Sequence, residues 1–289
     1  KLQSYIEQFR KKFPDYIYDC PVTKNWFFVV PRNKIKAIHD GRKGLQELLK
    51  VPEKDLDSYL LLVRELVSLL AKSGFSAKNL GITHSTLLGN YTPGKSDIDI
   101  IIYGKENGWK ILNYLRTATH NKLHWKTAEE WAEYYKEHRT SESAHFTEDE
   151  YVRHMARKRY EGMFGGAVFT LFTVEEPHET WLKWGEETYE PIGIATVSGT
   201  VTDDYNSHVR PGFYGIDDGI LMEGNHKMQV IDKQIPIKRI VTYSIPFVQQ
   251  AVTGEKIKAC GLLELVTPKK REQYYRVVVG YFDAYLGDR

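Results

Sequence analysis

The pattern of apolar residues changes near residue 186, and this change constrains the fold more than any other feature of the 289-residue chain. Before it, stretches with the 3.6-residue period of amphipathic helices alternate with short β-type runs. After it, short strand candidates follow one another, separated by turn residues and without a long helix. Repeated short strands at this spacing are typical of a small barrel or sandwich. The sequence therefore predicts an α+β chain that ends in a β-rich, barrel-like domain.

Three segments are expected: an N-terminal α/β segment over 1–50, a central domain over 51–186 and the β-rich domain over 187–289. In the first, apolar and basic residues alternate over 34–38, which predicts a strand with one solvated face. In the second, a broad apolar stripe over 52–74 predicts the clearest helix. Capping boxes (Thr127 with Glu130, Thr147 with Glu150) predict two more helices. Other expected helices cover 1–14, 41–50 and 106–118, and expected strands cover 16–18, 26–30, 80–84, 97–103, 163–174, 192–201, 219–223, 228–231, 239–243, 256–266 and 274–281.

Composition excludes several classes of protein. Forty Lys and Arg against 38 Asp and Glu leave a net charge of +2, which excludes histone-like basicity and an acidic solvating protein. The cysteines, Cys20 and Cys260, form neither a CxxC pair nor a zinc-binding pattern, so a disulfide-stapled scaffold is excluded and a cytoplasmic location is expected. No 18-residue window is continuously apolar, so neither a transmembrane helix nor a membrane partner is expected.

One stretch, residues 81–103, carries the chemistry. A strand leads into a glycine-containing turn, and a second strand opens with Asp97 and Asp99. Alternate residues of a strand point to the same face, so both carboxylates project together from an otherwise apolar strand. Their mutual repulsion is removed by a divalent cation, and hard oxygen ligands suit Mg²⁺ or Mn²⁺. Ser85, twelve residues before Asp97, begins the turn, where its hydroxyl and backbone N–H groups can hold nucleotide phosphates.

This pattern resembles a known superfamily. Ser85, Gly89 and the run Ser96-Asp97-Ile98-Asp99 match the signature of the DNA polymerase β-like nucleotidyltransferases, which is Gly-Ser or Gly-Gly, about ten residues, then Asp-x-Asp. The segment LLG…P…SDIDIIIYG is similar to the corresponding segment of predicted nucleotidyltransferases of an archaeal type. Those proteins combine a nucleotidyltransferase module with a β-rich C-terminal region. The resemblance implies a mixed sheet with flanking helices over about 55 to 175.

The resemblance also implies a function. The two aspartates would bind Mg²⁺ or Mn²⁺, and the turn would grip the triphosphate of a nucleoside triphosphate. The nucleotide-binding candidates are His84, Ser85, Gly89, Lys95 and Ser96. The expected reaction moves a nucleotidyl group to an acceptor that the sequence does not identify, and an RNA end is favoured.

Two departures from the family pattern keep other functions open. His84 stands where the family has glycine, which permits unusual backbone angles and close approach to a phosphate. The family also takes a third carboxylate from a later strand, but residues 166–174 contain none, so Glu175 just beyond them is the candidate. If the triad is incomplete, the chain is a catalytically inactive nucleotide- or RNA-binding protein. A third possibility is an antitoxin-like or assembly protein that keeps only the fold.

Overall fold

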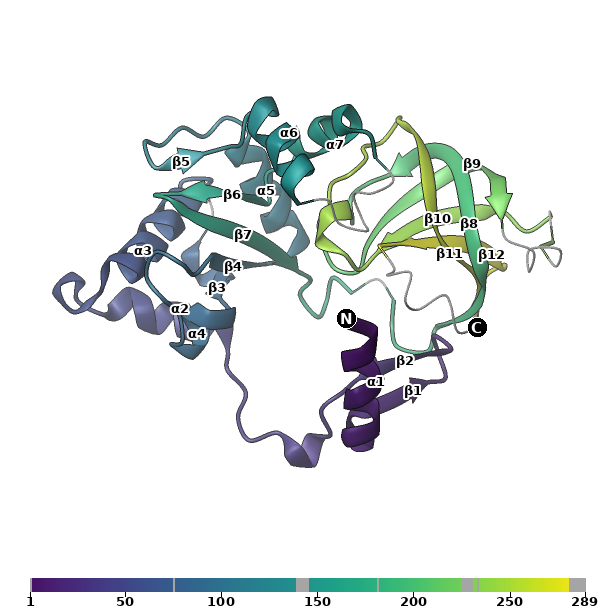
Figure 1. Ribbon diagram of the computed structural model, residues 1–289, viewed down its shortest axis with the longest axis horizontal. Helices are drawn as coiled ribbons and strands as arrows, with labels where there is room; N and C mark the ends of the chain where they lie inside the picture. Colours follow the sequence, from purple (N-terminus) through teal and green to yellow (C-terminus); the bar gives the residue numbers. More distant parts are fainter. Residues whose placement is uncertain are drawn as a thin grey trace. The chain divides into compact units, whose positions relative to one another are not determined.

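The computed structural model describes residues 2–74, 76–138, 146–180, 182–224, 231–232 and 234–280. The chain forms two compact units (Figure 1), a central unit of residues 39–180 with 208–210, and a barrel unit of the remainder. The sequence-based boundaries follow residues 50 and 186, whereas the contacts divide the chain after residues 38 and 180. The first difference arises because helix α2 (Gly41–Lys50) packs on strand β3 (Leu80–Ile82) of the central unit.

A five-stranded mixed sheet forms the core of the central unit, in the order β3-β4-β7-β6-β5. Strand β4 (Ile98–Tyr103) pairs parallel to β7 (Ala167–Val174), and the other pairs are antiparallel. The remaining strands are β6 (Glu161–Phe164) and β5 (Leu123–His124). Ile98, Ile100 and Ile102 are fully buried while the residues between them are half-buried, so alternate side chains of β4 serve the core and the opposite face.

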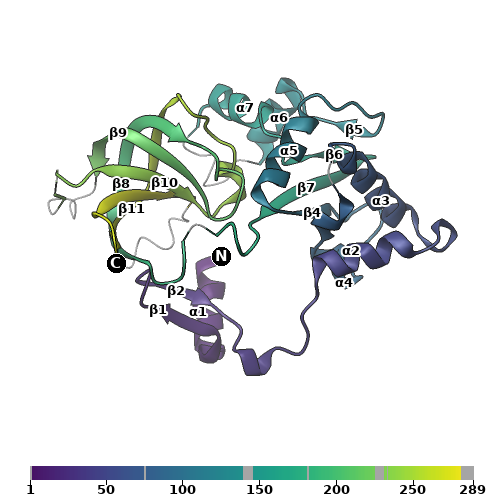
Figure 2. The same cartoon turned by 180° about the vertical axis from the view of Figure 1, so that it is seen from behind.

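Helices surround this sheet (Figure 2). They are α2, α3 (Ser58–Ala71), α4 (His84–Leu88), α5 (Lys105–Leu115), α6 (Ala128–Glu137) and α7 (Glu148–Ala156), with short 3₁₀ turns at Glu53–Asp55 and Ala77–Asn79. The helix expected over 52–74 begins only at Ser58, because the carboxylate of Asp57 caps it by accepting the N–H of Leu60 at 2.9 Å. Both capping boxes, at Thr127 and Thr147, are confirmed. Helices α6 and α7 that they open lie side by side.

Two strand predictions need correction. The strand expected over 163–174 is a hairpin of β6 and β7, because Gly165 and Gly166 both take positive φ and reverse the chain between them. Residues 34–38 form no strand. A 3₁₀ turn (Arg32–Lys34) and irregular backbone occupy this region. The alternating residues have no neighbouring strand with which their backbone groups could form hydrogen bonds.

The β-rich C-terminal region is a closed barrel, as the spacing of short strands predicts. Around it the order is β10-β12-β11-β8-β9, from β8 (Glu187–Asp203), β9 (Gly212–Gly224), β10 (Ile237–Thr242), β11 (Lys256–Pro268) and β12 (Tyr274–Val279), with a 3₁₀ turn at Ile245–Phe247. Its core includes Val197, Leu263 and Val277, which are almost completely buried. The strand candidate over 228–231 lies largely outside the described residues.

The first residues of the chain form a small module in the barrel unit. Helix α1 (Leu2–Lys12) lies against a hairpin of β1 (Ile17–Cys20) and β2 (Asn25–Phe28), with a 3₁₀ turn (Pro14–Tyr16) between them. The hairpin turn is tied to the barrel, because the N–H of Tyr189 donates to the carbonyl of Val22 at 2.9 Å. Among the described residues of both units, no helix is long and apolar enough to cross a membrane.

The barrel holds a buried ion pair. The Nε of Arg276 donates to Oε2 of Glu264 at 2.7 Å, and both side chains are almost fully buried. The guanidinium also lies 3.4 Å from the ring centroid of Tyr189. A second buried carboxylate, Glu187, accepts hydrogen bonds from the hydroxyls of Tyr189 and Tyr274, each at 3.1 Å.

Replacing one partner of this pair should be costly. Arg276→Met leaves the Glu264 carboxylate buried without its cation, and we expect a loss of about 3–5 kcal/mol in unfolding free energy. The double variant Arg276→Met with Glu264→Leu removes the stranded charge and should recover most of that loss. Denaturant unfolding of the three proteins measures both values. A single variant as stable as the double variant would contradict the expectation.

Candidate functional site

The two aspartates of the Asp-x-Asp motif lie at the start of β4. Asp97 immediately precedes the strand and is exposed, and the side chain of Asp99 is 17% exposed. Burial raises the pKa of Asp99, the nearby imidazole of His84 lowers it, and the negative charge of Asp97 raises it again. The two carboxylates are therefore electrostatic neighbours at the edge of an apolar strand.

His84 takes the backbone conformation that favours glycine. Its φ is +50°, in the left-handed region, and it begins helix α4. Its Nδ1 lies 3.3 Å from Oδ2 of Asp99, and its ring centroid is 5.5 Å from that of Phe172. The strained geometry of the turn is thus kept despite the histidine, and the imidazole lies against the second aspartate.

The other residues of the nucleotide-binding prediction lie between β3 and β4: Ser85 within α4 instead of at the start of a turn, Gly89 at the end of that helix, and Lys95 and Ser96 in the turn before β4. The carbonyl of Ser85 accepts the N–H of Asn90 at 3.1 Å, and Gly89 ends α4 with φ +67°. Ser96 uses its hydroxyl oxygen within the second turn, where it accepts the N–H of Thr92 at 2.8 Å. Lys95 is exposed. The structure therefore brings His84 to Asp99, while Lys95 and Ser96 immediately precede Asp97.

Tyr59 of α3 joins the two halves of this site. Its buried hydroxyl donates to the carbonyl of Asp97 at 2.7 Å, and the hydroxyl of Thr86 lies 2.7 Å from the same oxygen. Because the tyrosine proton is given to the carbonyl, the hydroxyl of Thr86 is the donor in the second bond. Sequence reasoning missed this residue, because a tyrosine within the apolar stripe of a helix resembles a core residue; its polar tip was the available signal.

Glu175 does not join the aspartates. In the parallel pairing of β4 with β7, Asp99 lies opposite Thr170 and Tyr103 lies opposite Val174. Glu175 therefore follows β7 at the other end of the sheet, five residues from the row of Asp99, or roughly 16 Å along the strand. There its Oε1 accepts a hydrogen bond from Nζ of Lys105 at 2.9 Å. This glutamate forms an ion pair away from the motif.

Glu161 is the carboxylate that shares a row with Asp99. It lies opposite Thr170 in the antiparallel pair of β6 and β7, and Thr170 lies opposite Asp99 in the next pair. Residues directly opposite one another share a face of the sheet. Burial raises the pKa of Glu161, Lys126 lowers it and Asp97 raises it. The sequence pattern gives no signal for Glu161, because it predicts one strand beginning at residue 163 where the structure has the β6–β7 hairpin.

A cation from far along the chain also lies at this face. The guanidinium carbon of Arg210 lies 4.6 Å from the ring centroid of Phe172, the ring that His84 also contacts. Residues 208–210 belong to the central unit, and Nε2 of His208 lies 2.9 Å from the carbonyl of Lys105. No local sequence pattern points to Arg210, since it is separated from Asp99 by more than a hundred residues.

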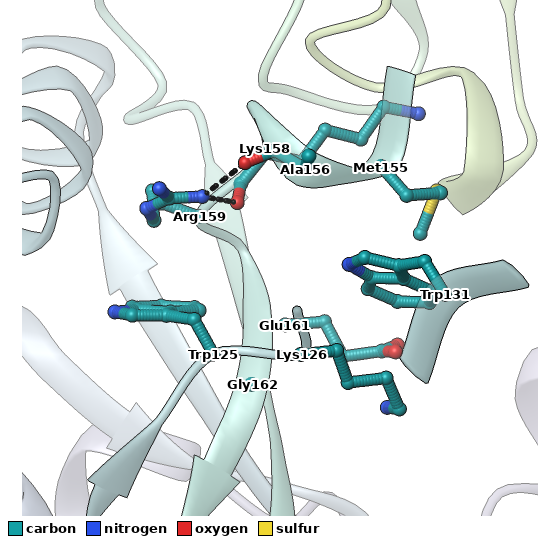
Figure 3. A pocket seen from close by; sticks show the side chains of 9 residues that line it. All are labelled: Trp125, Lys126, Trp131, Met155, Ala156, Lys158, Arg159, Glu161 and Gly162. Atoms are coloured by element: carbon teal, nitrogen blue, oxygen red, sulfur yellow. Dashed lines mark hydrogen bonds between the residues drawn. The ribbon is translucent and has the colours of Figure 1, made fainter. Parts of the chain in front are cut away.

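Beside Glu161 lies a small hollow lined by two tryptophans (Figure 3). The guanidinium of Arg159 lies over Trp125 at 4.9 Å and donates to the carbonyls of Ala156 and Lys158. A side chain at Gly162 would meet the Trp125 ring at 2.7 Å, so glycine is needed for this packing. The tryptophans pack closely around this edge of the sheet.

The donor set suits a hard cation. Two neighbouring carboxylates, one of them partly desolvated, are ligands of the kind that Mg²⁺ prefers together with substrate phosphates. Within the described ranges, no three His, Cys, Asp or Glu side chains come together as a metal-binding group. A Mg²⁺ ion at this site would therefore use Asp97 and Asp99 with oxygen atoms from outside the protein.

The chain is similar to a known archaeal protein. The chain is 30% identical over 218 residues to an uncharacterized protein of Methanocaldococcus jannaschii, an alignment that covers 75% of this chain. The chain spans 59% of the length of that relative. No protein-family model matches the chain, and no solved structure matches it.

Glu161→Gln should stabilise the protein at alkaline pH. The raised pKa of Glu161 means that its ionised form is disfavoured in the folded state relative to the unfolded state. This cost is present above the folded pKa and disappears below the unfolded value near 4.3. We therefore expect a higher melting temperature for Glu161→Gln at pH 8, with a gain that shrinks as the pH falls toward 4. Glu133→Gln, at an exposed position of α6, is the control; an equal gain there would contradict this reasoning.

Tyr59→Phe should loosen the start of β4. The change leaves the Asp97 carbonyl and the Thr86 hydroxyl without their buried partner, so we expect a loss of about 1–3 kcal/mol. Tyr91→Phe is a matched control, because its hydroxyl donates to the exposed carboxylate of Asp57 and its removal should cost less. Denaturant unfolding compares the two, and equal losses would argue against a structural role for the Tyr59 bridge.

Proposed function

We propose that the chain is a metal-dependent nucleotidyltransferase of the polymerase β-like type, which moves a nucleotidyl group from a nucleoside triphosphate to an acceptor hydroxyl. The observation that carries the proposal is the group of carboxylates at the start of β4. The charge of Asp97 raises the pKa of Asp99, and Glu161 lies in the same cross-strand row as Asp99, with Thr170 between them. A glycine-like backbone at His84 beside this pair is a second support.

Asp97 and Asp99 would hold Mg²⁺ or Mn²⁺, which would neutralise phosphate charge and polarise the phosphorus that is attacked. Glu161 is suited to accept the proton of the acceptor hydroxyl at a carboxylate oxygen. Its raised pKa brings a carboxylate closer to the range in which a general base works at neutral pH. The acceptor oxygen then bonds to the α-phosphorus, and pyrophosphate leaves.

The triphosphate would be held by the turn and by a cation. Ser85 follows the left-handed residue at the start of the turn, and Lys95 is exposed two residues before Asp97. Arg210 faces the same side of β7 through its contact with Phe172, and its planar guanidinium suits two phosphate oxygens at once. An RNA end remains the favoured acceptor.

A second candidate is a nucleotide- or RNA-binding protein without catalysis. Two observations favour it: Thr170, not a carboxylate, lies directly opposite Asp99, and the imidazole of His84 already lies 3.3 Å from Asp99. On this reading the site binds a nucleotide and releases no pyrophosphate.

Thermal unfolding with each nucleoside triphosphate, with and without Mg²⁺, tests the proposal. At about 100 times its dissociation constant a nucleotide stabilises by about 2.7 kcal/mol, which raises the melting temperature by several degrees. We expect this rise to require Mg²⁺, to be lost in the double variant Asp97→Asn with Asp99→Asn, and to persist in Glu175→Gln.

Pyrophosphate release with an RNA acceptor then separates the two candidates. Release that is lost in Asp99→Asn and strongly reduced in Glu161→Gln supports transfer, whereas a Mg²⁺-dependent shift without release supports binding alone. A cooperatively unfolding protein that shows neither would contradict both candidates.

A further inference from the structure

Positive charge is concentrated at one end of the chain. Residues 1–38 contain eight Lys and Arg and three Asp and Glu, a net charge of +5, whereas the rest contains 32 basic and 35 acidic residues. The described part of this segment forms the module of α1 and the β1–β2 hairpin and the stretch that follows it, with its 3₁₀ turn (Arg32–Lys34). Arg32, Lys34 and Lys36 of that stretch supply much of the excess, so a nearly neutral protein carries a basic N-terminal segment.

The same module exposes aromatic rings. Tyr18 and Phe27 lie directly opposite each other in the hairpin and are 42% and 43% exposed. They share a face of the hairpin. The opposite face contacts α1, since the ring centroid of Phe9 lies 5.0 Å from that of Phe28, which in turn lies 5.2 Å from Trp26, and Phe28 itself remains 47% exposed. Tyr18 and Phe27 thus form an exposed aromatic pair on the face away from α1.

Cations and rings are interleaved across the module. The guanidinium of Arg10 lies 4.6 Å from the Trp26 ring centroid, and Nζ of Lys34 lies 5.0 Å from that of Tyr16. The hairpin is held in place by the barrel through its turn, at Val22, and the aromatic pair lies on the strands outside that turn. The module therefore presents flat rings and positive charge on an anchored support.

We propose that this N-terminal module binds single-stranded nucleic acid, with bases stacked on Tyr18 and Phe27 and phosphates contacted by the surrounding lysines and arginines. Exposed aromatic rings within a basic surface are the combination that single strands recognise, because every base has a face for stacking and every nucleotide a negative charge. The net charge of +5 favours a polyanion over an apolar protein segment as the occupant of this face. The inference does not rest on the proposed transfer reaction.

Anisotropy of fluorescently labelled U12 and dT12 with the whole chain tests this proposal, with a 12-base-pair duplex for comparison. We expect single strands to bind more tightly than the duplex. Tyr18→Ala with Phe27→Ala should weaken binding at least about fivefold, the lower end of the range for losing one stacked base. Preference for U12 or dT12 identifies RNA or DNA as the natural strand.

The salt dependence tests the charge contribution. Each single-strand phosphate contact adds about 0.7 to the slope of log affinity against log salt concentration. Replacing Lys11, Lys24 and Lys36, all exposed, by Gln should therefore reduce that slope by about 2.

A control keeps this result separate from the active-site proposal. Tyr243→Ala removes a tyrosine of the barrel unit that is 51% exposed and should leave strand affinity unchanged. Failure of the transferase proposal would appear only in the nucleotide and pyrophosphate measurements. Absence of single-strand binding, tighter binding of the duplex, or undiminished affinity in Tyr18→Ala with Phe27→Ala would overturn the inference.

Discussion

The parallel pairing of β4 with β7 determines which side chains can act together in the central unit. It sets Asp99 opposite Thr170, and the antiparallel return of the chain into β6 then sets Glu161 opposite the same threonine. The same register sends Glu175 to the far end of the sheet, where Lys105 holds it. A shift of this register by one residue would turn Asp99 into the core and an isoleucine into the site. The candidate chemistry therefore depends on the buried isoleucines that hold β4 in register.

The site itself is held by contacts from outside the motif. Tyr59 ties the start of β4 to α4 through two hydrogen bonds of its hydroxyl, and this fixes the turn relative to the aspartates. His84 keeps a left-handed backbone that costs a non-glycine residue free energy. Its imidazole lies beside Asp99 and lowers the pKa of that carboxyl, which offsets part of the effect of burial. These two features explain how the turn holds a left-handed backbone at a histidine.

Much of the framework was predictable, and the failures have physical causes. The capping boxes at Thr127 and Thr147 and the closed barrel follow from local patterns and spacing, which the structure confirms. The motif predicts a strand that opens with both aspartates, and β4 contains Asp99 with Asp97 just before it. Alternation along one strand says nothing about which strand pairs with it. Glu161 and Arg210 come from elements whose neighbours are set by tertiary packing, so periodicity in the sequence could not find them. The strand prediction for residues 34–38 is wrong for the same reason, because an alternating segment forms a β-strand only when a partner strand lies beside it.

The uneven charge of the chain connects the two proposals without making one depend on the other. The site at β4 is acidic, with Asp97, Asp99 and Glu161 at one edge of its sheet, and such a surface repels a polyanion unless cations intervene. A nucleic-acid acceptor would therefore gain little affinity from the carboxylates themselves. Beyond the cations at the site, the basic excess of residues 1–38 is where the sequence concentrates attraction for a polyanion. If a nucleic acid binds at Tyr18 and Phe27 and reacts elsewhere, changes at these two rings would alter its affinity without altering Asp97, Asp99 and Glu161.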